Sequence, residues 1–235
     1  MLSIVIPTMN EEETLPKLLA SIQSQDFSDY EIIIADNYSK DRTREIAEDF
    51  DAVIVGGGMP GPGRNRGARA ARGEKFLFLD ADVILPHKEF LTNIVNEFDE
   101  RGLGIATCTV DPMSDRLVDR VFHNIYNFYT QKIMFWRAYA PGFFIFTTKD
   151  IHQKIYGFDE EIKLAEDHDY TRRAVEHGKF GFLKEKIPVS VRRFDRDGRF
   201  NVAIKYIFCE IHSFLFGGIK SDAFKYRFGY DKKEK

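Results

Sequence analysis

Two aspartates end an apolar run near the middle of the chain. In FLFLDADVIL, residues 76–85, Asp80 and Asp82 follow four apolar residues and are one residue apart. A short apolar run of this kind is typical of a buried strand. Two carboxylates at its end can bind a hard divalent cation and leave most of the cation's coordination positions to water and phosphate. A solvated turn would have the same short pattern, so the surrounding elements are needed to choose between a metal site and a turn.

The sequence around the aspartates predicts strands that alternate with helices. Asn10, followed by Glu13, is expected to cap a helix that runs to about Gln25. Alternation predicts an α/β fold with a mostly parallel sheet, whose carboxyl strand ends form a ligand-binding crevice. Asp80 and Asp82 should therefore lie at that crevice and outside the core. The expected strands cover residues 2–8, 31–36, 52–55, 76–79 and 104–110.

Other polar residues follow the first two predicted strands. Thr8 and Glu11 come after the first strand, and Asp36 and Asn37 come after the second. Groups that converge from several strand ends can form a site for a ligand of nucleotide size. A carboxylate there can accept a hydrogen bond from a base N–H or from a ribose hydroxyl.

Two classes of enzyme carry Asp-x-Asp after a buried strand. In phosphohydrolases of the haloacid-dehalogenase type, the first aspartate is a nucleophile and the second an acid or base. In nucleotide-sugar glycosyltransferases, the pair and its metal hold a diphosphate leaving group. The phosphohydrolases usually begin with this strand, whereas three predicted strands precede it here. The second class is therefore favoured, and a phosphohydrolase and a non-catalytic sugar-nucleotide binding module stay as alternatives.

Four ordered motifs resemble those of the inverting family-2 glycosyltransferases, which have the GT-A fold. The matches are collinear over about residues 2–193, and four motifs in order are more specific than any one of them. The third motif leads an Arg-Asn-x-Gly helix into the Asp-x-Asp strand. The segments are SIVIPTMNEEETL, ADNYSKDRT, GPGRNRGARAARGEKFLFLDAD and PGFFIFTTKDIHQKIYGFDEEIKLAEDHDYTRRAVEHG.

The resemblance implies a GT-A domain over residues 1–198, with a nucleotide-binding half (1–110) and an acceptor half (111–198). A basic helical extension, residues 199–235, would follow. The implied reaction is a metal-dependent transfer, with inversion, of a sugar from a nucleoside-diphosphate sugar to a hydroxyl acceptor. The acceptor would be a glycan or a lipid-linked molecule.

Residue by residue, the resemblance implies a donor site with a divalent cation, Mn²⁺ or Mg²⁺, on Asp80 and Asp82. Asp82 would be the direct ligand. Asn37 stands where the family often has a second acid, which leaves the nucleotide base undetermined. Arg64 has two open roles, a contact to the nucleotide phosphates and a surface salt bridge. The implied donor-site residues are Pro7, Thr8, Glu11, Asp36, Asn37, Arg64, Asp80, Ala81 and Asp82.

Inverting transfer needs a base that takes the proton of the acceptor hydroxyl. The segment LAEDHDYTRR offers Glu166, Asp167 and Asp169 at a predicted helix start, where acids are also common for stability alone. The resemblance selects Asp167 as the catalytic base and implies that Glu166 faces the acceptor or the sugar. Asp169 lies about 200° around the helix from Asp167 and should point away from it.

Two arginines after the last predicted strand have an open role. Arg192 and Arg193 are candidates for closing over the phosphates of the leaving group. A solvated loop would explain them equally well.

Composition restricts the class of protein. A chain of 235 residues with 43% hydrophobic residues can bury a full core, which excludes a disordered protein. Cys108 and Cys209 lack CxxC spacing, which disfavours a zinc site and predicts a reducing, cytoplasmic location. The short apolar start, MLSIVIPT, is expected to be a strand and not a signal peptide.

Charge is uneven along the chain. Residues 1–178 carry 20 basic and 30 acidic residues, whereas residues 179–235 carry 14 basic and 7 acidic ones. Residues 201–218 are apolar nearly all round, which predicts either a helix packed on the core or an interfacial helix on the cytoplasmic face of a membrane. The interfacial helix would suit a lipid or lipid-linked acceptor. No nucleic-acid-binding motif is present, so no nucleic-acid partner is expected.

Overall fold

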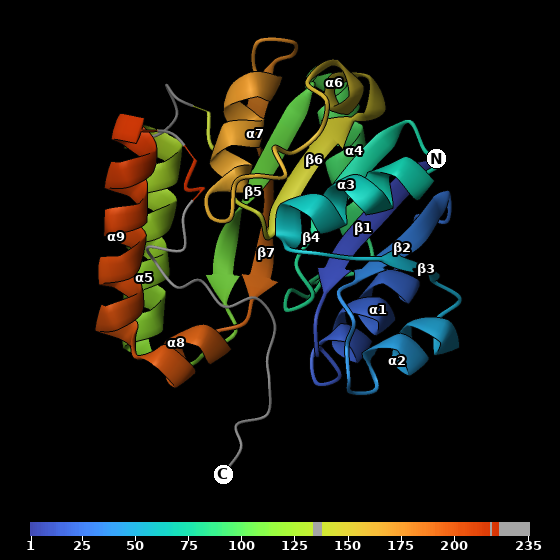
Figure 1. Cartoon of the computed structure of the whole chain (residues 1–235), viewed down its shortest axis with the longest axis horizontal. Coiled ribbons are helices and arrows are strands. Elements are labelled where there is room, and N and C mark those ends of the chain that lie inside the picture. Colours follow the sequence, from blue (N-terminus) through green and yellow to red (C-terminus); the bar gives the residue numbers. More distant parts are fainter. Residues whose placement is uncertain (134–137, 217, 221–235) are drawn as a thin grey trace.

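The computed structural model describes residues 1–133, 138–216 and 218–220. Seven strands and the helices around them form an α/β domain (Figure 1). The strands are β1 (Leu2–Thr8), β2 (Tyr30–Asp36), β3 (Val53–Gly56), β4 (Lys75–Leu79), β5 (Ile105–Pro112), β6 (Phe144–Thr148) and β7 (Phe180–Val189). The helices are α1 (Leu15–Gln23), α2 (Thr43–Asp49), α3 (Pro60–Ala70), α4 (Phe90–Glu100), α5 (Leu117–Phe128), α6 (Lys149–Lys154), α7 (Glu166–Ala174), α8 (Arg192–Asp197) and α9 (Arg199–Phe216), and a π-helical segment (Tyr129–Ile133) extends α5.

The strands form one sheet in the order β3-β2-β1-β4-β6-β5-β7. β6 runs antiparallel to both of its neighbours, β4 and β5, and the other neighbouring pairs are parallel. The predicted α/β fold with a mostly parallel sheet is therefore confirmed. The antiparallel β6 was not predicted, because an apolar run carries no information about the direction in which a buried strand enters a sheet.

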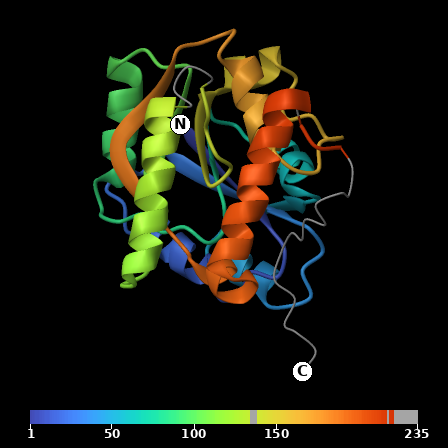
Figure 2. The same ribbon diagram turned by 90° about the vertical axis from the view of Figure 1, so that its left-hand side faces the viewer.

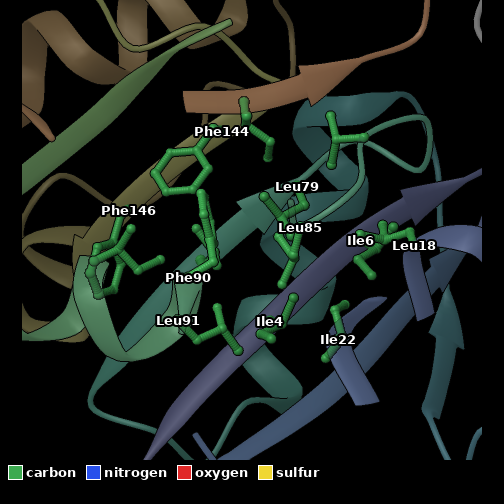
Figure 3. Packing of buried hydrophobic residues seen from close by; sticks show 14 of the residues in the cluster. Ile4, Ile6, Leu18, Ile22, Leu79, Leu85, Phe90, Leu91, Phe144 and Phe146 are labelled. Atoms are coloured by element: carbon green, nitrogen blue, oxygen red, sulfur yellow. The ribbon is translucent and has the colours of Figure 1, made fainter. Parts of the chain in front are cut away.

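Apolar residues cover both faces of the sheet. Successive side chains of a strand point to opposite faces, and in β1 Ile4 and Ile6 belong to one buried cluster while Val5 belongs to the other. Helices α1, α2 and α4 pack on the first face, and α3, α6 and α7 pack on the second. Figure 3 shows the first cluster, in which Phe90 of α4 lies beside Phe144 of β6. This double cover explains why the strands are continuous apolar runs.

The first helix begins later than the sequence predicts. Helix α1 starts at Leu15, and Asn10 does not cap it. Asn10 has a φ of 55°, in the left-handed region that asparagine tolerates better than most residues. Its side-chain oxygen accepts from the Lys40 N–H (2.9 Å), and its own N–H donates to the Ser39 hydroxyl (2.9 Å). The predicted capping box is therefore wrong, because contacts to the loop after β2 use the polar groups of Asn10.

Helix α3 lies unusually close to β1. The sequence predicts a start near Arg64, but the helix begins at Pro60, because the proline starts the helix in place of breaking it. A Cβ on Gly67 would lie 2.3 Å from Cγ1 of Val5, so only a glycine allows this approach. Arg64, one turn before Gly67, is thereby carried down to the edge of the sheet where β1 and β4 end.

Two later segments also differ from the predictions. The sequence predicts two short strands over residues 180–183 and 188–191, but β7 is one ten-residue strand. It also predicts one long helix over residues 115–136, where the structure has α5 followed by the π-helical segment, with residues 134–136 outside the described part. In the part of the chain that the structure describes, we find no helix with both the length and the apolar character that a membrane span requires.

Candidate functional site

The carboxyl ends of β1 and β2 are joined by hydrogen bonds. Thr8 and Asp36 are register partners at the ends of these parallel strands. The Thr8 hydroxyl donates to Oδ1 of Asp36 (3.3 Å), and the Asn37 N–H donates to the Thr8 carbonyl (2.8 Å). Asp36 is buried and also accepts from Arg44 (3.3 Å). Its carboxylate is therefore held rigidly at the carboxyl end of β2.

The chain after β3 packs tightly against this corner. A Cβ on Gly57 would lie 2.5 Å from the Ala35 carbonyl oxygen and 2.6 Å from the Asn37 nitrogen, so the backbone there passes directly over the end of β2. Pro7 is buried beside it. The Asn37 amide donates to the sulfur of Met9 (3.5 Å) and is half-buried.

Arg64 is the buried centre of the site. Its side chain is 2% exposed. It donates to Oδ1 of Asp80 (2.8 Å), to Oε1 of Glu166 (2.8 Å) and to the Gly142 carbonyl (3.0 Å). The guanidinium carbon also lies 5.5 Å from the centre of the Phe158 ring. A surface salt bridge, one of the two roles left open for Arg64, is therefore ruled out.

Asp167 lies at the start of α7, next to this cluster. Its Oδ2 accepts from the Gly142 N–H (2.7 Å), and its Oδ1 accepts from the His168 N–H (2.9 Å). Burial raises the pKa of Asp167 above its ordinary value, although the charge of Arg64 and these N–H groups oppose the rise. Burial and the nearby Asp167 likewise raise the pKa of Glu166, against the charge of Arg64. Glu166 and Asp167 thus both have a raised pKa, and the positive charge of Arg64 acts on both.

Aromatic packing anchors α7 in this position. The Tyr170 ring is fully buried and stacks on Phe158 with 4.0 Å between ring centroids, and its hydroxyl lies 3.0 Å from Nδ1 of His152. Asp169 pairs with Arg172 (2.9 Å) and Arg173 (2.7 Å), on a different side of the helix from Asp167. Of the three acids in the first turn of α7, Glu166 and Asp167 therefore belong to the cluster around Arg64, whereas Asp169 pairs with arginines of its own helix.

Asp82 faces a second arginine. Nε of Arg192 lies 3.3 Å from Oδ2 of Asp82, and its Nη2 lies 2.7 Å from Oε2 of Glu11. Burial raises the pKa of Glu11 to about 7 even though Arg192 lowers it. Burial also raises the pKa of Asp82, again against the opposite effect of Arg192. One guanidinium thus lies between two carboxylates from the segments that follow β1 and β4.

The backbone fastens Arg192 beside the aspartate turn. The Ser190 N–H donates to the Asp82 carbonyl (3.0 Å), and the Ile84 N–H donates to the Pro188 carbonyl (3.1 Å). Arg193 turns the other way and donates to the Tyr206 hydroxyl of α9 (3.0 Å). Within the part of the chain that the structure describes, Arg192 is the one of these two arginines whose hydrogen bonds reach Glu11 and Asp82.

The donor set fits a hard divalent cation that shares its coordination with a ligand. Asp80 and Asp82 flank the buried Ala81, and the Asp80 side chain is 41% exposed. Within the described residues, no group of three or more His, Cys, Asp or Glu side chains forms a closed metal site. Mg²⁺ and similar cations are commonly held by one or two carboxylates together with water and phosphate oxygens. Arg192 shows that a positive charge is accommodated at Asp82.

Sequence reasoning missed Gly142 and the ion pairs of Arg64. Gly142 uses its N–H on Asp167 and its carbonyl on Arg64, and a Cβ there would lie 2.7 Å from Nη2 of Arg64. The Pro-Gly pair shortly before β6 was the available signal, since such a pair marks a backbone turn. The partners of Arg64 gave no signal, because they lie 16 and 102 positions away.

Comparison with known proteins identifies the fold family. The model of the family described as "Glycosyl transferase family 2" matches residues 3–157. A curated relative, "Glycosyltransferase AglE" of Haloferax volcanii, is 26% identical over 189 residues, which cover 75% of this chain and 62% of AglE.

Two solved structures have the same fold. The structure of Staphylococcus aureus TarS 1–349 is 24% identical, with a TM-score of 0.66, and covers 90% of this chain and 65% of that one. The mannosyltransferase PcManGT from Pyrobaculum calidifontis, in complex with GDP-Man and Mn²⁺, is 20% identical, with a TM-score of 0.66, and covers 88% and 64%. These likenesses confirm the predicted GT-A fold. The chain spans less than two thirds of the length of AglE and of both structures.

Replacing Arg64 by Met should destabilise the protein, because Asp80, Glu166 and Asp167 would lose their shared positive charge. Breaking a buried ion pair from one side typically costs about 3–5 kcal/mol. Adding Glu166→Gln to Arg64→Met should restore part of the loss, since one uncompensated charge is then removed. Urea denaturation of both variants, which gives the free energy of unfolding, is the measurement.

Arg69→Met is the matched control for this cycle. Arg69 is on the same helix, is 63% exposed and lies 3.6 Å from Glu160, so a change below about 1 kcal/mol is expected. A double variant less stable than Arg64→Met alone would contradict the role assigned to Arg64.

Proposed function

The chain belongs to glycosyl transferase family 2, and from this premise we propose that it transfers a sugar from a nucleoside-diphosphate sugar to a hydroxyl group. One observation carries the proposal. Arg64 bonds Asp80, at the carboxyl end of β4, and Glu166, next to Asp167 at the start of α7. Arg64 thus links the end of β4, proposed to bind the donor, to the start of α7, which carries the buried Asp167 with its raised pKa.

In this proposal residues 1–110 bind the donor, residues 111–198 contribute the acceptor side, and residues 199–235 form an extension. Thr8, Asp36 and Asn37 would contact the base and the ribose, with Pro7 as an apolar wall. The complex of PcManGT with GDP-Man and Mn²⁺ supports a nucleotide sugar as the donor, because that protein has the same fold. The Asn37 amide now bonds to Met9, which a bound nucleotide would displace. The base that the protein prefers would depend on which base atoms then bond to this amide.

Asp80 and Asp82 would hold the cation, Mn²⁺ or Mg²⁺, with Asp82 as the direct ligand. When bound, such a cation neutralises charge that develops on the departing diphosphate. Asp80 stays oriented by Arg64 in this arrangement, so it can accept from the ribose or contribute one oxygen to the cation.

Asp167 would act as the general base. As the acceptor oxygen attacks the anomeric carbon, its proton passes to Asp167, and the bond to the diphosphate breaks on the opposite face, which inverts the configuration. The raised pKa favours proton uptake. The N–H groups of Gly142 and His168 fix the direction of the carboxylate. Glu166, bonded to Arg64, would face the sugar or the acceptor.

Arg192 would change partners when the donor binds. Its guanidinium now lies on Glu11 and Asp82, where a cation and a diphosphate bring new charge. A cation at Asp82 repels the guanidinium, whereas phosphate oxygens attract it. We therefore assign Arg192 to binding the leaving diphosphate. Arg193, whose charge also lowers the pKa of Asp82, would attract the diphosphate as it approaches the site.

The alternatives are less well supported. A phosphohydrolase would need Asp80 as a free nucleophile, but Asp80 is bonded to Arg64 at 2.8 Å. A binding module without activity would have no use for a buried, oriented Asp167. The acceptor stays open between a glycan and a lipid-linked molecule, and the cytoplasmic location remains a prediction.

Nucleoside diphosphates should stabilise the protein far more with Mn²⁺ than with EDTA, because the cation links Asp82 to the phosphates. The midpoint of thermal unfolding with UDP or GDP is the measurement. Asp82→Asn should abolish the Mn²⁺-dependent part of the shift. Asp49→Asn, which removes an exposed carboxylate from α2, should keep it. Equal shifts with EDTA would rule out the proposed cation site.

Arg192→Gln should raise the affinity for Mn²⁺ in the absence of nucleotide, because the competing guanidinium is removed. The same variant should weaken the binding of UDP or GDP with Mn²⁺ present, because one phosphate contact is lost. Calorimetric titration measures both affinities. Arg196→Gln is the matched control on α8, since Arg196 pairs with Asp197. An unchanged Mn²⁺ affinity in Arg192→Gln would contradict the exchange of partners.

Asp167→Asn should lower turnover by about 10²–10⁴-fold and leave donor affinity nearly unchanged, since the base acts on the acceptor. Release of nucleoside diphosphate, with the sugar nucleotide that gives the largest thermal shift, is the readout. Asp169→Asn is the control, because Asp169 pairs with Arg172 and Arg173 and should affect stability more than turnover. Full activity of the Asp167→Asn variant would show that Asp167 is not the general base.

A further inference from the structure

Large apolar side chains are exposed mainly on two helices. Of the 14 large apolar residues that are exposed in the described part of the chain, nine lie on α5 and α9. We call their surface the α5–α9 face. It consists of Leu117, Val118, Val121, Ile125, Phe128, Phe200, Ile204, Tyr206 and Phe208.

The spacing places these side chains in two stripes. On α5, Leu117, Val121 and Ile125 recur every four residues, and on α9 Phe200, Ile204 and Phe208 do the same, so each set lies along one side of its helix. Leu117 is 76% exposed and Phe200 is 75% exposed. Of the two alternatives predicted for residues 201–218, packing on the core does not hold for Ile204 and Phe208, which are exposed, and Phe200 just before them is exposed as well.

The two helices are joined into one surface. Arg199 of α9 donates to both carboxylate oxygens of the buried Asp119 of α5 (2.6 and 3.0 Å). The rings of Phe122 and Phe200 also meet, with 6.0 Å between their centroids. Figure 2 views this side of the molecule, with α5 and α9 in front of the sheet. The stripes therefore belong to a single side of the protein and not to two separate patches.

Charge indicates what covers this face. Arg120, Lys132 and Lys205 are exposed on or next to the two helices. On α5 the one acid, Asp119, is buried and paired with Arg199. A second copy on this face would oppose two basic surfaces. Anionic lipid headgroups would complement the basic residues, and the acyl boundary would take the apolar stripes.

We propose that the α5–α9 face lies on an anionic lipid bilayer. The surface itself depends only on these two helices, whereas its use rests on the proposed transfer reaction. Arg192 of α8 bonds to Asp82, and Gly198 alone separates α8 from α9. The candidate site thus adjoins the docked helix. A lipid-linked acceptor in the bilayer could then present its hydroxyl to Asp167 without leaving the membrane.

Sedimentation with vesicles tests the proposal on the full chain. The protein should bind vesicles of equal parts phosphatidylcholine and phosphatidylglycerol, bind pure phosphatidylcholine weakly, and bind less at high salt. Phe200→Ser with Ile204→Ser, on α9, should weaken binding at least about tenfold, and Leu117→Ser with Ile125→Ser, on α5, should do the same. Arg120→Glu with Lys205→Glu should remove the preference for anionic vesicles.

Tyr156→Ser is the matched control, because Tyr156 is 94% exposed but lies after α6. It should bind vesicles like the unchanged protein. All variants should keep the Mn²⁺-dependent thermal shift with nucleotide, which reports on folding and on the donor site. Failure of the docking surface is thereby distinguished from failure of the proposed function.

Three results would overturn the proposal. Vesicle binding that the face variants leave unchanged would place the contact elsewhere. Absent vesicle binding, together with a dimer that the face variants dissociate in analytical ultracentrifugation, would assign the face to a second copy of this chain. Absent vesicle binding by a monomer would leave the face without the proposed lipid partner.

Discussion

The site depends on the burial of one guanidinium among carboxylates. Arg64 is 2% exposed and bonds directly to Asp80 and Glu166, and its charge opposes the raised pKa of Asp167. Carboxylates drawn this close in a space poor in water would otherwise repel each other or take up protons. The positive charge therefore lets β4 and α7, two elements far apart in the chain, present acidic groups to one crevice.

The two arginines of the crevice differ in how firmly they are held. Arg64 belongs to α3, which can approach β1 only because residue 67 is a glycine, and its two terminal nitrogens donate to three partners from separate segments of the chain. Arg192 is 21% exposed and belongs to the six-residue helix α8. We infer a fixed counterion that organises the carboxylates and an exchangeable one that can follow the charge of the ligand.

Much of the fold could be predicted, and the misses have physical causes. The apolar strands were predicted correctly because a strand buried on both faces must be apolar throughout. The start of α1 was missed because Asn10 bonds to Ser39 and Lys40, which only the folded chain brings near. The sequence left open whether α9 packs on the core or lies at an interface, because an apolar stripe does not reveal which neighbour, if any, covers it.

The sequence by itself determined the strand order along the chain, the polar residues at the strand ends and the family motifs, because periodicity and local spacing are properties of the chain. Only the tertiary structure decided which charges meet. The pairing of Arg64 with Glu166, of Arg192 with Glu11, and of Gly142 with Asp167 depends on how α3, α7 and α8 pack against the sheet. Contacts across such distances in the chain follow from packing and leave no local pattern.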